Sequence, residues 1–214
     1  MSSTPTLLRR AEHEALQALT LSGTVLDLGG EKGASYLSFI KGSFTVTALN
    51  MAPAASPDII HDLEQPLPLS DASYDNVILI NVLEHIYEYR ALLSEAARVL
   101  RPGGTIAIIV PFLFPIHPSP RDYWRFTAAT LRRELEQLGL SHITIVPLGS
   151  GVFAARYVLL DRLMPGALRF IGYYTLRYVT YALDYLFSSV ARLLRKGYSP
   201  SEYALGYCVT AIQP

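Results

Sequence analysis

The stretch VLDLGGEKG, residues 25–33, decides the fold. A short apolar run passes there into a glycine-rich loop, and a helical pattern follows from Ala34 to Lys41. Parallel sheets bind ligands at the carboxyl ends of their strands, where glycines let the backbone approach and a helix N-terminus offers free N–H groups. A plain turn without a ligand would use the same residues. The spacing differs from the dinucleotide fingerprint G-x-G-x-x-G, and Glu31 inside the loop would repel a pyrophosphate.

Short apolar strands alternate with helical segments on both sides of this loop. Residues 5–20 and 89–100 are predicted to be helical, and so are residues 127–138, with Thr127 as the N-cap and Gly139 as the stop. Continuous apolar strands between helices are typical of a parallel sheet that is covered on both faces. We therefore predict an α/β fold with strands at residues 24–28, 44–49, 58–61, 76–80, 105–110, 142–146 and 206–212.

The composition describes one neutral domain. Of the 214 residues, 50% are hydrophobic and 17% charged, which excludes global disorder. Lys and Arg together number 18, as do Asp and Glu, so we expect no nucleic-acid partner. The single cysteine cannot form an internal disulfide, and the first residues lack the apolar segment of a signal peptide. We expect a single domain over residues 1–214, located in the cytoplasm, with no stretch long enough to span a bilayer.

Four segments in a fixed order carry a family resemblance, over roughly residues 20–148. Together they resemble the class I S-adenosylmethionine-dependent methyltransferases of the type 11 kind. The resemblance implies a doubly wound, mostly parallel, seven-stranded Rossmann-like sheet whose last strand runs antiparallel. The segments are VLDLGGEKG (25–33), IIHDLEQPLPLSDASYDNVI (59–78), NVLEHI (81–86) and RVLRPGGTIAIIVP (98–111).

The resemblance also implies which residues hold S-adenosylmethionine. In that family the acid of the loop, here Asp27, orients the amino group of the methionine part. The acid after the third strand, here Asp62, meets the adenine amino group, with Leu63 beside the ring. Asn81 matches a backbone contact to the methionine part. The full expected set is Asp27, Gly29, Gly30, Gly33, Asn50, Met51, Asp62, Leu63 and Asn81.

Asn50 departs from the family pattern, because an acid usually stands at the end of the second strand and holds the ribose hydroxyls. A neutral amide can donate and accept, but its hydrogen bonds lack the assistance of a charge. We therefore expect an Asn50→Asp variant to bind the cofactor more tightly.

Residues 111–127 follow the fifth strand and carry the groups expected on the acceptor side. His117 is a candidate base, with Asp122 and Arg125 as positioning groups. His85, Tyr123 and Trp124 are candidate substrate contacts. Asp122 and Arg125 could instead pair structurally and hold the loop to the next helix. His85, His117 and Asp122 lack the spacing of metal ligands, so no metal site is expected.

The resemblance implies transfer of a methyl group from S-adenosylmethionine to a small or medium-sized acceptor with an oxygen or nitrogen nucleophile. Positioning supplies much of the acceleration in such a reaction, so the absence of an obvious catalytic dyad is expected. A non-catalytic binding or interaction module stays open as an alternative. A nicotinamide-dependent oxidoreductase is disfavoured by the loop spacing and by Asn50.

A helical insertion, residues 151–201, is expected between the core at 23–150 and the last strand at 202–214, with an N-terminal helix within residues 1–22. Residues 167–196 read as one helix with a broad tyrosine-rich face. Three readings compete, namely a homodimer interface, a membrane-surface helix and a lid over the acceptor pocket. A homodimer or a self-packed cap ranks first and peripheral membrane contact second. The tyrosines are Tyr173, Tyr174, Tyr178, Tyr181 and Tyr185, and the cationic end is Arg192, Arg195 and Lys196.

Overall fold

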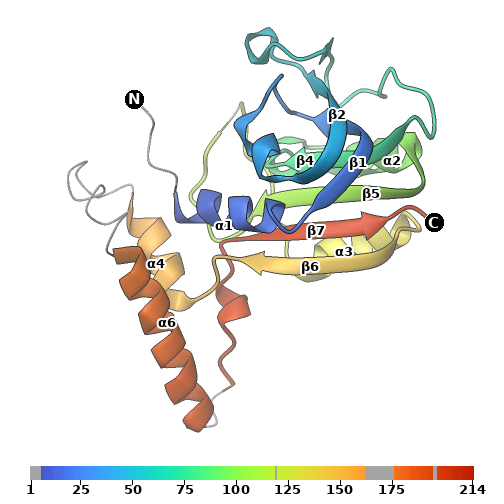
Figure 1. Cartoon of the computed structure of the whole chain (residues 1–214). Helices are drawn as coiled ribbons and strands as arrows, with labels where there is room; N and C mark the ends of the chain where they lie inside the picture. Colours follow the sequence, from blue (N-terminus) through green and yellow to red (C-terminus); the bar gives the residue numbers. More distant parts are fainter. Residues whose placement is uncertain (1–5, 119, 162–175, 195–196) are drawn as a thin grey trace.

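The chain forms one seven-stranded sheet with strand order β3-β2-β1-β4-β5-β7-β6 (Figure 1). The computed structural model describes residues 6–118, 120–161, 176–194 and 197–214. β7 runs antiparallel to both of its neighbours, and the other pairs in the sheet are parallel, as predicted. The strands are β1 (Thr20–Leu28), β2 (Lys41–Asn50), β3 (Ile59–Ile60), β4 (Tyr74–Ile80), β5 (Leu100–Pro111), β6 (Ser141–Leu148) and β7 (Gly206–Ile212).

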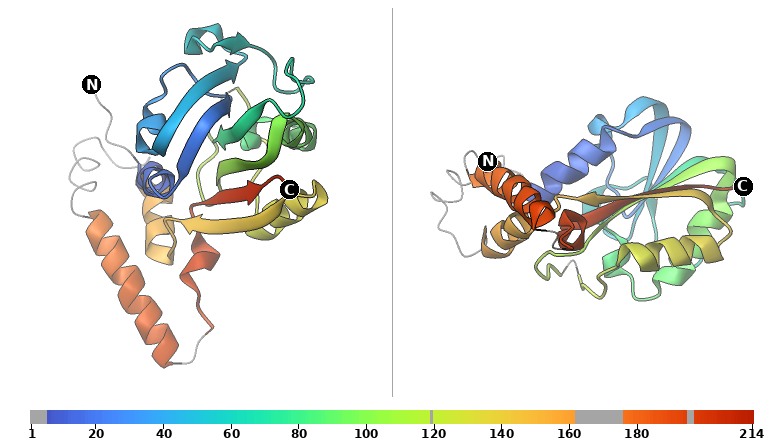
Figure 2. Two further views of the ribbon diagram at one scale, coloured as in Figure 1. Left: turned by 45° about the vertical axis from the view of Figure 1, so that its right-hand side comes forward. Right: turned by 90° about the horizontal axis from the view of Figure 1, so that it is seen from below.

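Helices cover both faces of this sheet, which confirms the doubly wound arrangement (Figure 2). α2 (Tyr89–Val99) and α3 (Ala128–Gln137) pack against one apolar cluster. α1 (Leu7–Leu16) and α4 (Val152–Asp161) pack against the other. Apolar side chains on each strand point alternately to the two faces, so two buried clusters form and the sheet lies between them.

Side-chain caps begin two of the predicted helices, α1 and α3. The hydroxyl of Thr6 accepts a hydrogen bond from the Arg9 amide at 3.1 Å and begins α1. The hydroxyl of Thr127 accepts one from the Thr130 amide, also at 3.1 Å, and begins α3 as predicted. α1 is shorter than the predicted 5–20, because Thr20 already pairs with Lys41 in the sheet.

The helix predicted from Ala34 to Lys41 is wrong. A short 3₁₀ turn, Ser35–Phe39, occupies this position, and β2 begins at Lys41. Ala34 provides no side-chain cap, and the register of β1 with β2 requires extended backbone from Lys41 onward. Too few residues therefore remain for a full α-helix, and α1 from the N-terminal segment covers this face instead.

α4 and α6 (Leu176–Leu193) form an arm that leaves the carboxyl edge of the sheet after β6 (Figure 1). The buried carboxylate of Asp184 on α6 accepts hydrogen bonds from the amides of Phe153 and Ala154, both at 2.9 Å. It thereby caps the first turn of α4, where amides lack partners within the helix. Among the described residues, no helix combines the length and apolarity that crossing a membrane requires. Residues 162–175, 195 and 196 of the predicted insertion lie outside the described residues.

Candidate active site

A cavity of about 690 Å³ opens at the carboxyl ends of the strands. α1 forms one side, the loop after β1 forms a second, and the ends of β4 and β5 close the rest. The cavity thus lies where parallel sheets bind their ligands, at the carboxyl ends of the strands. The lining residues are Thr6, Leu8, Arg9, Glu12, His13, Glu31, Ser35, Tyr36, Ile80, Asn81, His85, Pro111, Phe114 and His117.

The glycine loop after β1 has the close backbone approach that its sequence predicts. Gly29 has φ +81°, and a Cβ there would lie 2.6 Å from a methyl of Val82. A Cβ on Gly30 would lie 2.1 Å from a carboxylate oxygen of Asp27. Only glycine therefore fits at either position without movement of a neighbour.

Asp27 lies fully buried beneath this loop. The hydroxyl of Tyr36, which lines the cavity, donates a hydrogen bond to Asp27 Oδ2 at 2.5 Å. Oδ1 has no hydrogen-bond partner among the described residues. Burial raises the pKa of Asp27 to about 7, although the bond from Tyr36 opposes this. An orphaned carboxylate oxygen beside a cavity fits the ammonium group of an amino acid, which is the role that the resemblance implied for Asp27.

Asn50 holds the glycine loop from the neighbouring strand. Its amide nitrogen donates to the carbonyls of Gly29 and Gly30 at 2.7 and 3.1 Å. Its amide oxygen accepts from the Ala52 amide at 2.9 Å. Every polar atom of this side chain thus has a partner within the chain, and the amide cannot be replaced by a carboxylate without loss of both donated bonds.

The residues expected at the adenine end lie beyond the described lining of this cavity. Met51 is 56% exposed, Asp62 is exposed, and Leu63 is buried. Asp62 Oδ1 accepts a hydrogen bond from the Glu64 amide at 3.0 Å, which is a local turn contact. Gly33, with φ +71°, completes the loop. The adenine assignments therefore stay predictions.

Glu84, His85 and His117 form what we call the histidine wall, on the other side of the cavity. Glu84 is fully buried, and both carboxylate oxygens lack a hydrogen-bond partner among the described residues. The Nε2 atoms of His85 and His117 lie 3.7 and 3.8 Å from Glu84 Oε1. The nearby Glu84 carboxylate raises the pKa of His117, and partial burial opposes the shift. Both histidines line the cavity, as expected of acceptor-side residues.

Asp122 and Arg125 form an ion pair that holds the backbone of His117. Arg125 Nη2 donates to Asp122 Oδ2 at 2.7 Å, and the guanidinium holds the pKa of Asp122 down at about 2. The same carboxylate accepts from the His117 amide at 2.9 Å. Arg125 also donates to carbonyls of Phe114 and Trp124. The geometry thus matches the structural reading of the pair, with Asp122 as a positioning residue for His117.

Tyr123 and Trp124 lie on the far side of this loop. The Trp124 ring packs edge-on to Tyr89 at 5.3 Å and near Phe126, against the core beneath α2 and α3. Tyr123 is 38% exposed and contacts Tyr87. Neither residue is in the described lining of the cavity, so their assignment as substrate contacts stays a prediction.

Three residues of the site were missed in the sequence. Glu12 is buried on α1, 3.0 Å from Arg9 and accepting a hydrogen bond from Asn81 at 3.0 Å. Burial raises the pKa of Glu12. Nothing in the sequence marks Tyr36 as a site residue, because it lies in a segment that is predicted to be an ordinary helix. Glu84 lies within the motif NVLEHI and could have been found there, since a charged residue next to a histidine at a strand end is a candidate ligand site.

Comparison with known proteins finds similarity to methyltransferases. Residues 26–108 match the family described as methyltransferase domain. A probable S-adenosylmethionine-dependent methyltransferase of Mycolicibacterium smegmatis is 36% identical over 88 residues, which are 38% of this chain and 34% of that protein. The phthiotriol/phenolphthiotriol dimycocerosates methyltransferase of Mycobacterium tuberculosis is 28% identical over 173 residues, 71% of this chain and 62% of that one.

A solved structure shares the fold over almost the whole chain. It is the phosphoethanolamine N-methyltransferase 2 of Haemonchus contortus in complex with S-adenosyl-L-methionine, with a TM-score of 0.58 and 16% identity over 96% of this chain and 52% of that one. Residues 26–108 thus match the methyltransferase domain family, and the whole chain shares the fold of a solved S-adenosylmethionine-dependent methyltransferase, in agreement with the sequence motifs. The chain spans only about a third to two thirds of the length of the curated relatives that it matches.

Proposed function

We propose that this protein transfers a methyl group from S-adenosylmethionine to a small or medium-sized acceptor with an oxygen or nitrogen nucleophile. The observation that carries the proposal is the pairing of two unlike walls around one cavity. We call one of them the glycine-loop wall; it consists of the glycine loop, Tyr36 and the buried Asp27. It offers a carboxylate oxygen of Asp27 that has no hydrogen-bond partner among the described residues. The histidine wall offers nitrogen and oxygen acceptors that favour loss of an acceptor's proton.

The charge of the site supports a cationic ligand. Glu12 and Glu31 line the cavity, and Asp27 and Glu84 are buried next to lining residues. Against these acids stands Arg9, which is already paired with Glu12. Such a field attracts a sulfonium and an ammonium and repels the pyrophosphate of a nicotinamide dinucleotide.

Each wall has its own task in the proposed reaction. When bound, S-adenosylmethionine supplies an activated methyl group on sulfur. Asp27 would accept a hydrogen bond from the amino group of the cofactor, with Tyr36 fixing the carboxylate in place. The histidine wall would orient the acceptor's nucleophilic atom and take up its proton. α1 would help to exclude water, since Thr6 and Leu8 line the cavity.

Titration calorimetry with S-adenosylmethionine, its demethylated product, NAD and NADP tests the proposal. We expect binding of the first two, with the affinity reduced at least tenfold in Asp27→Asn. Transfer of labelled methyl to a panel of small phenols, carboxylates and amines would then define the acceptor. Binding without any transfer would favour the non-catalytic module, and binding of NAD alone would overturn the proposal.

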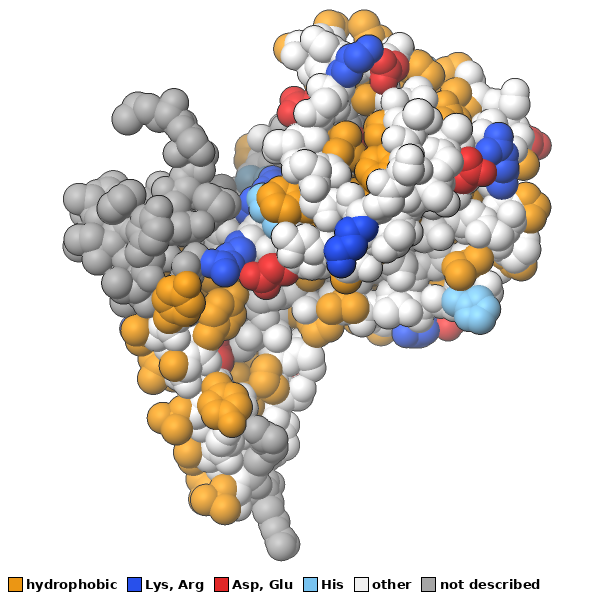
Figure 3. All heavy atoms as spheres, viewed as in Figure 1, with side chains coloured by type: hydrophobic (Ala, Val, Ile, Leu, Met, Phe, Trp, Pro, Cys, Tyr) orange, Lys and Arg blue, Asp and Glu red, His pale blue; other side chains and the backbone are white. Residues whose placement is uncertain are grey.

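We also propose that the arm joins two copies of the chain. α6 exposes a row of large apolar side chains, among them Tyr185 at 72%, Leu186 at 60% and Leu193 at 82% (Figure 3). Asp184, the acidic residue of α6, is buried against α4 and lies outside this row. A contiguous apolar face of this kind is rare on a free monomer. A cytoplasmic location, expected from the single cysteine, belongs to the same proposal.

Sedimentation analysis tests the dimer. We expect the wild-type protein to be a dimer and a Tyr185→Asp, Leu186→Asp double variant to be a monomer. Ile60→Asp, at an exposed apolar position on β3 at the other end of the sheet, is the matched control and should stay dimeric. A wild-type monomer that floats with liposomes would instead support membrane contact, the second reading.

A further inference from the structure

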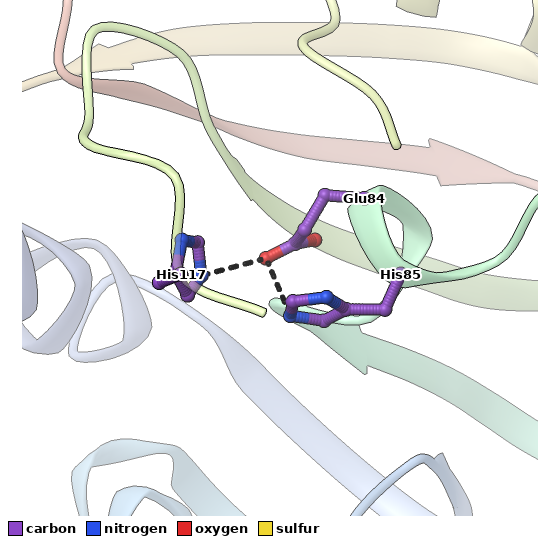
Figure 4. A group of neighbouring side chains, drawn as sticks. All are labelled: Glu84, His85 and His117. Atoms are coloured by element: carbon purple, nitrogen blue, oxygen red, sulfur yellow. Dashed lines mark ion pairs between the residues drawn. The ribbon is translucent and has the colours of Figure 1, made fainter. Parts of the chain in front are cut away.

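Three atoms that accept hydrogen bonds converge at the histidine wall (Figure 4). Glu84 Oε1 lies 3.7 Å from His85 Nε2 and 3.8 Å from His117 Nε2, and the three ligand atoms all lie within 4.8 Å of one another. Glu84 comes from the turn after β4, and His117 from the loop after β5. The fold thus brings the three groups together from two different strand ends.

The other ring nitrogens determine where the histidine protons lie. His85 Nδ1 is 2.6 Å from the Arg121 carbonyl oxygen, which can only accept. His117 Nδ1 is 3.2 Å from the Pro115 carbonyl oxygen and 3.3 Å from Asp122 Oδ2, which are also acceptors. A neutral imidazole carries one proton, so in both rings it belongs on Nδ1. Both Nε2 atoms then present lone pairs toward the Glu84 carboxylate.

Three lone pairs that face one another repel unless a positive charge lies between them. A second ring proton would make an ion pair with Glu84, but 3.7 and 3.8 Å exceed hydrogen-bond length, so the buried Glu84 oxygens would still lack a hydrogen-bond partner among the described residues. Two ligands bound at 2.0–2.1 Å to a tetrahedral metal ion lie roughly 3.4 Å apart, a few tenths of an ångström less than the observed spacing. We propose that Glu84, His85 and His117 bind a divalent transition-metal ion of the zinc or iron(II) type.

The surroundings have the features of such a site. Each ring donates its remaining N–H to a carbonyl or carboxylate, the arrangement that orients histidine ligands around metals. The Tyr123 and Trp124 amides donate to the Glu84 carbonyl at 2.7 and 3.2 Å, which ties the turn after β4 to the loop after β5. The ligand geometry therefore depends little on the metal for its assembly.

The chain supplies three ligands, and the histidine side chains are 13% and 27% exposed at the cavity. Two histidines and one carboxylate with an open side are typical of catalytic rather than structural metal ions. Given the proposed methyl transfer, the open positions would take the acceptor's hydroxyl or carboxylate oxygen. A metal ion lowers the pKa of a bound hydroxyl. With both Nε2 atoms on the metal, water in the cavity rather than a histidine would take the hydroxyl proton, and the acceptor would react as the oxyanion; a carboxylate acceptor would have no proton to lose. This reading favours oxygen over nitrogen as the nucleophile.

Metal titration of the EDTA-treated protein tests the site without any activity assay. We expect one equivalent of Co²⁺ to bind with a visible absorption spectrum of nitrogen and oxygen ligands, and Zn²⁺ to displace it. His85→Ala and Glu84→Gln should each weaken binding at least tenfold to a hundredfold. His13→Ala, which changes a histidine of the same cavity outside the cluster, should bind as the wild type does.

The titration separates the metal site from the proposed function. Wild-type protein that binds neither ion at tens of micromolar, or a Glu84→Gln, His85→Ala double variant that binds normally, would overturn the metal site. S-adenosylmethionine titrated into the metal-free protein reports on the cofactor site alone, so either proposal can fail while the other stands. Thermal unfolding of each variant shows whether a loss of binding reflects a loss of the fold.

Discussion

The two walls of the cavity differ in how far the chain satisfies its own polar groups. On the glycine-loop wall, Asn50 and Tyr36 use their donors on the loop carbonyls and on Asp27, and one carboxylate oxygen is left over. On the histidine wall, Glu84 and the two imidazoles turn acceptors toward one another. The glycine-loop wall is therefore a preformed binding site for a ligand, whereas the acceptors of the histidine wall need a cation between them.

The largest expected effect is a loss of stability when the Asp122–Arg125 pair, which positions His117, is broken. Arg125→Ala leaves the Asp122 carboxylate, only 1% exposed, without its charged partner. Removal of one member of a buried pair costs about 3 kcal/mol or more in the free energy of unfolding. Arg121→Ala in the same loop, an exposed residue bonded to the Tyr123 hydroxyl, should change stability by less than about 0.5 kcal/mol. Urea denaturation measures both, and equal values would show that the pair does not hold the loop.

The next effect tests the rigidity of the glycine-loop wall. Gly29→Ala combines a positive φ with a Cβ 2.6 Å from the β-branched, buried Val82, so we expect a loss of roughly 2–3 kcal/mol in stability. Gly33→Ala also has a positive φ, but no described atom lies within 4 Å of its Cβ. Its loss should be about 1 kcal/mol. A similar loss of stability in both variants would mean that the loop moves to accommodate the added methyl group and is not a preformed binding site.

A smaller effect reverses an expectation from the sequence. The family pattern predicts that Asn50→Asp tightens cofactor binding. In the structure, a carboxylate at this position would face the Gly29 and Gly30 carbonyls and lose two donated bonds, a change of roughly 2 kcal/mol. We therefore expect weaker cofactor binding and lower stability. Calorimetry and thermal unfolding of the variant decide between the two views, and tighter binding would show that Asn50 turns toward the ribose when the ligand is present.

The fold and the glycine-loop wall could largely be predicted from the sequence. Short apolar runs such as residues 76–80 and 105–110 predict buried strands of a parallel sheet. The motif at 25–33 indicates which strand precedes the glycine loop. The missing helix after Gly33 could not be predicted, because its residues have helical spacing. The register between Thr20 and Lys41, a long-range property, decides that the chain becomes extended there.

The histidine wall could be predicted only in part. The sequence predicts His85 as a substrate contact, His117 as a base and Asp122 as a positioning group, but it assigns Glu84 no chemical role. The pairing of Asp122 with Arg125 is one of the two sequence interpretations, and the structure has it. Sequence spacing cannot show that Asp122 also accepts a hydrogen bond from the His117 amide, or that Glu84 points between the rings. Side-chain direction at a strand end depends on the turn that follows, and that turn is held by contacts with a distant loop.

The smallest expected effect is a pH dependence that belongs to the glycine-loop wall alone. Burial raises the pKa of Asp27 to about 7, well above the ordinary value of an aspartate. The folded protein therefore holds a proton that the unfolded chain releases near pH 4, and this contribution to stability falls as the pH rises through 7. Cofactor binding should show the opposite trend, because an ammonium group pairs only with the ionised carboxylate.

Between pH 6 and pH 7.5, the ionised fraction of a group with a pKa near 7 rises from roughly one tenth to roughly three quarters. We thus expect the affinity for S-adenosylmethionine to rise about eightfold over this range in calorimetric titrations. Methylthioadenosine, which lacks the amino acid part, should bind with nearly constant affinity. Asp27→Asn should remove the dependence for S-adenosylmethionine and leave the affinity for methylthioadenosine as constant as before. A rise that persists in Asp27→Asn would locate the titrating group elsewhere around the cavity, at Glu12 on α1 or at His117, whose pKa values are also raised. Such a result would break the division of tasks between the two walls.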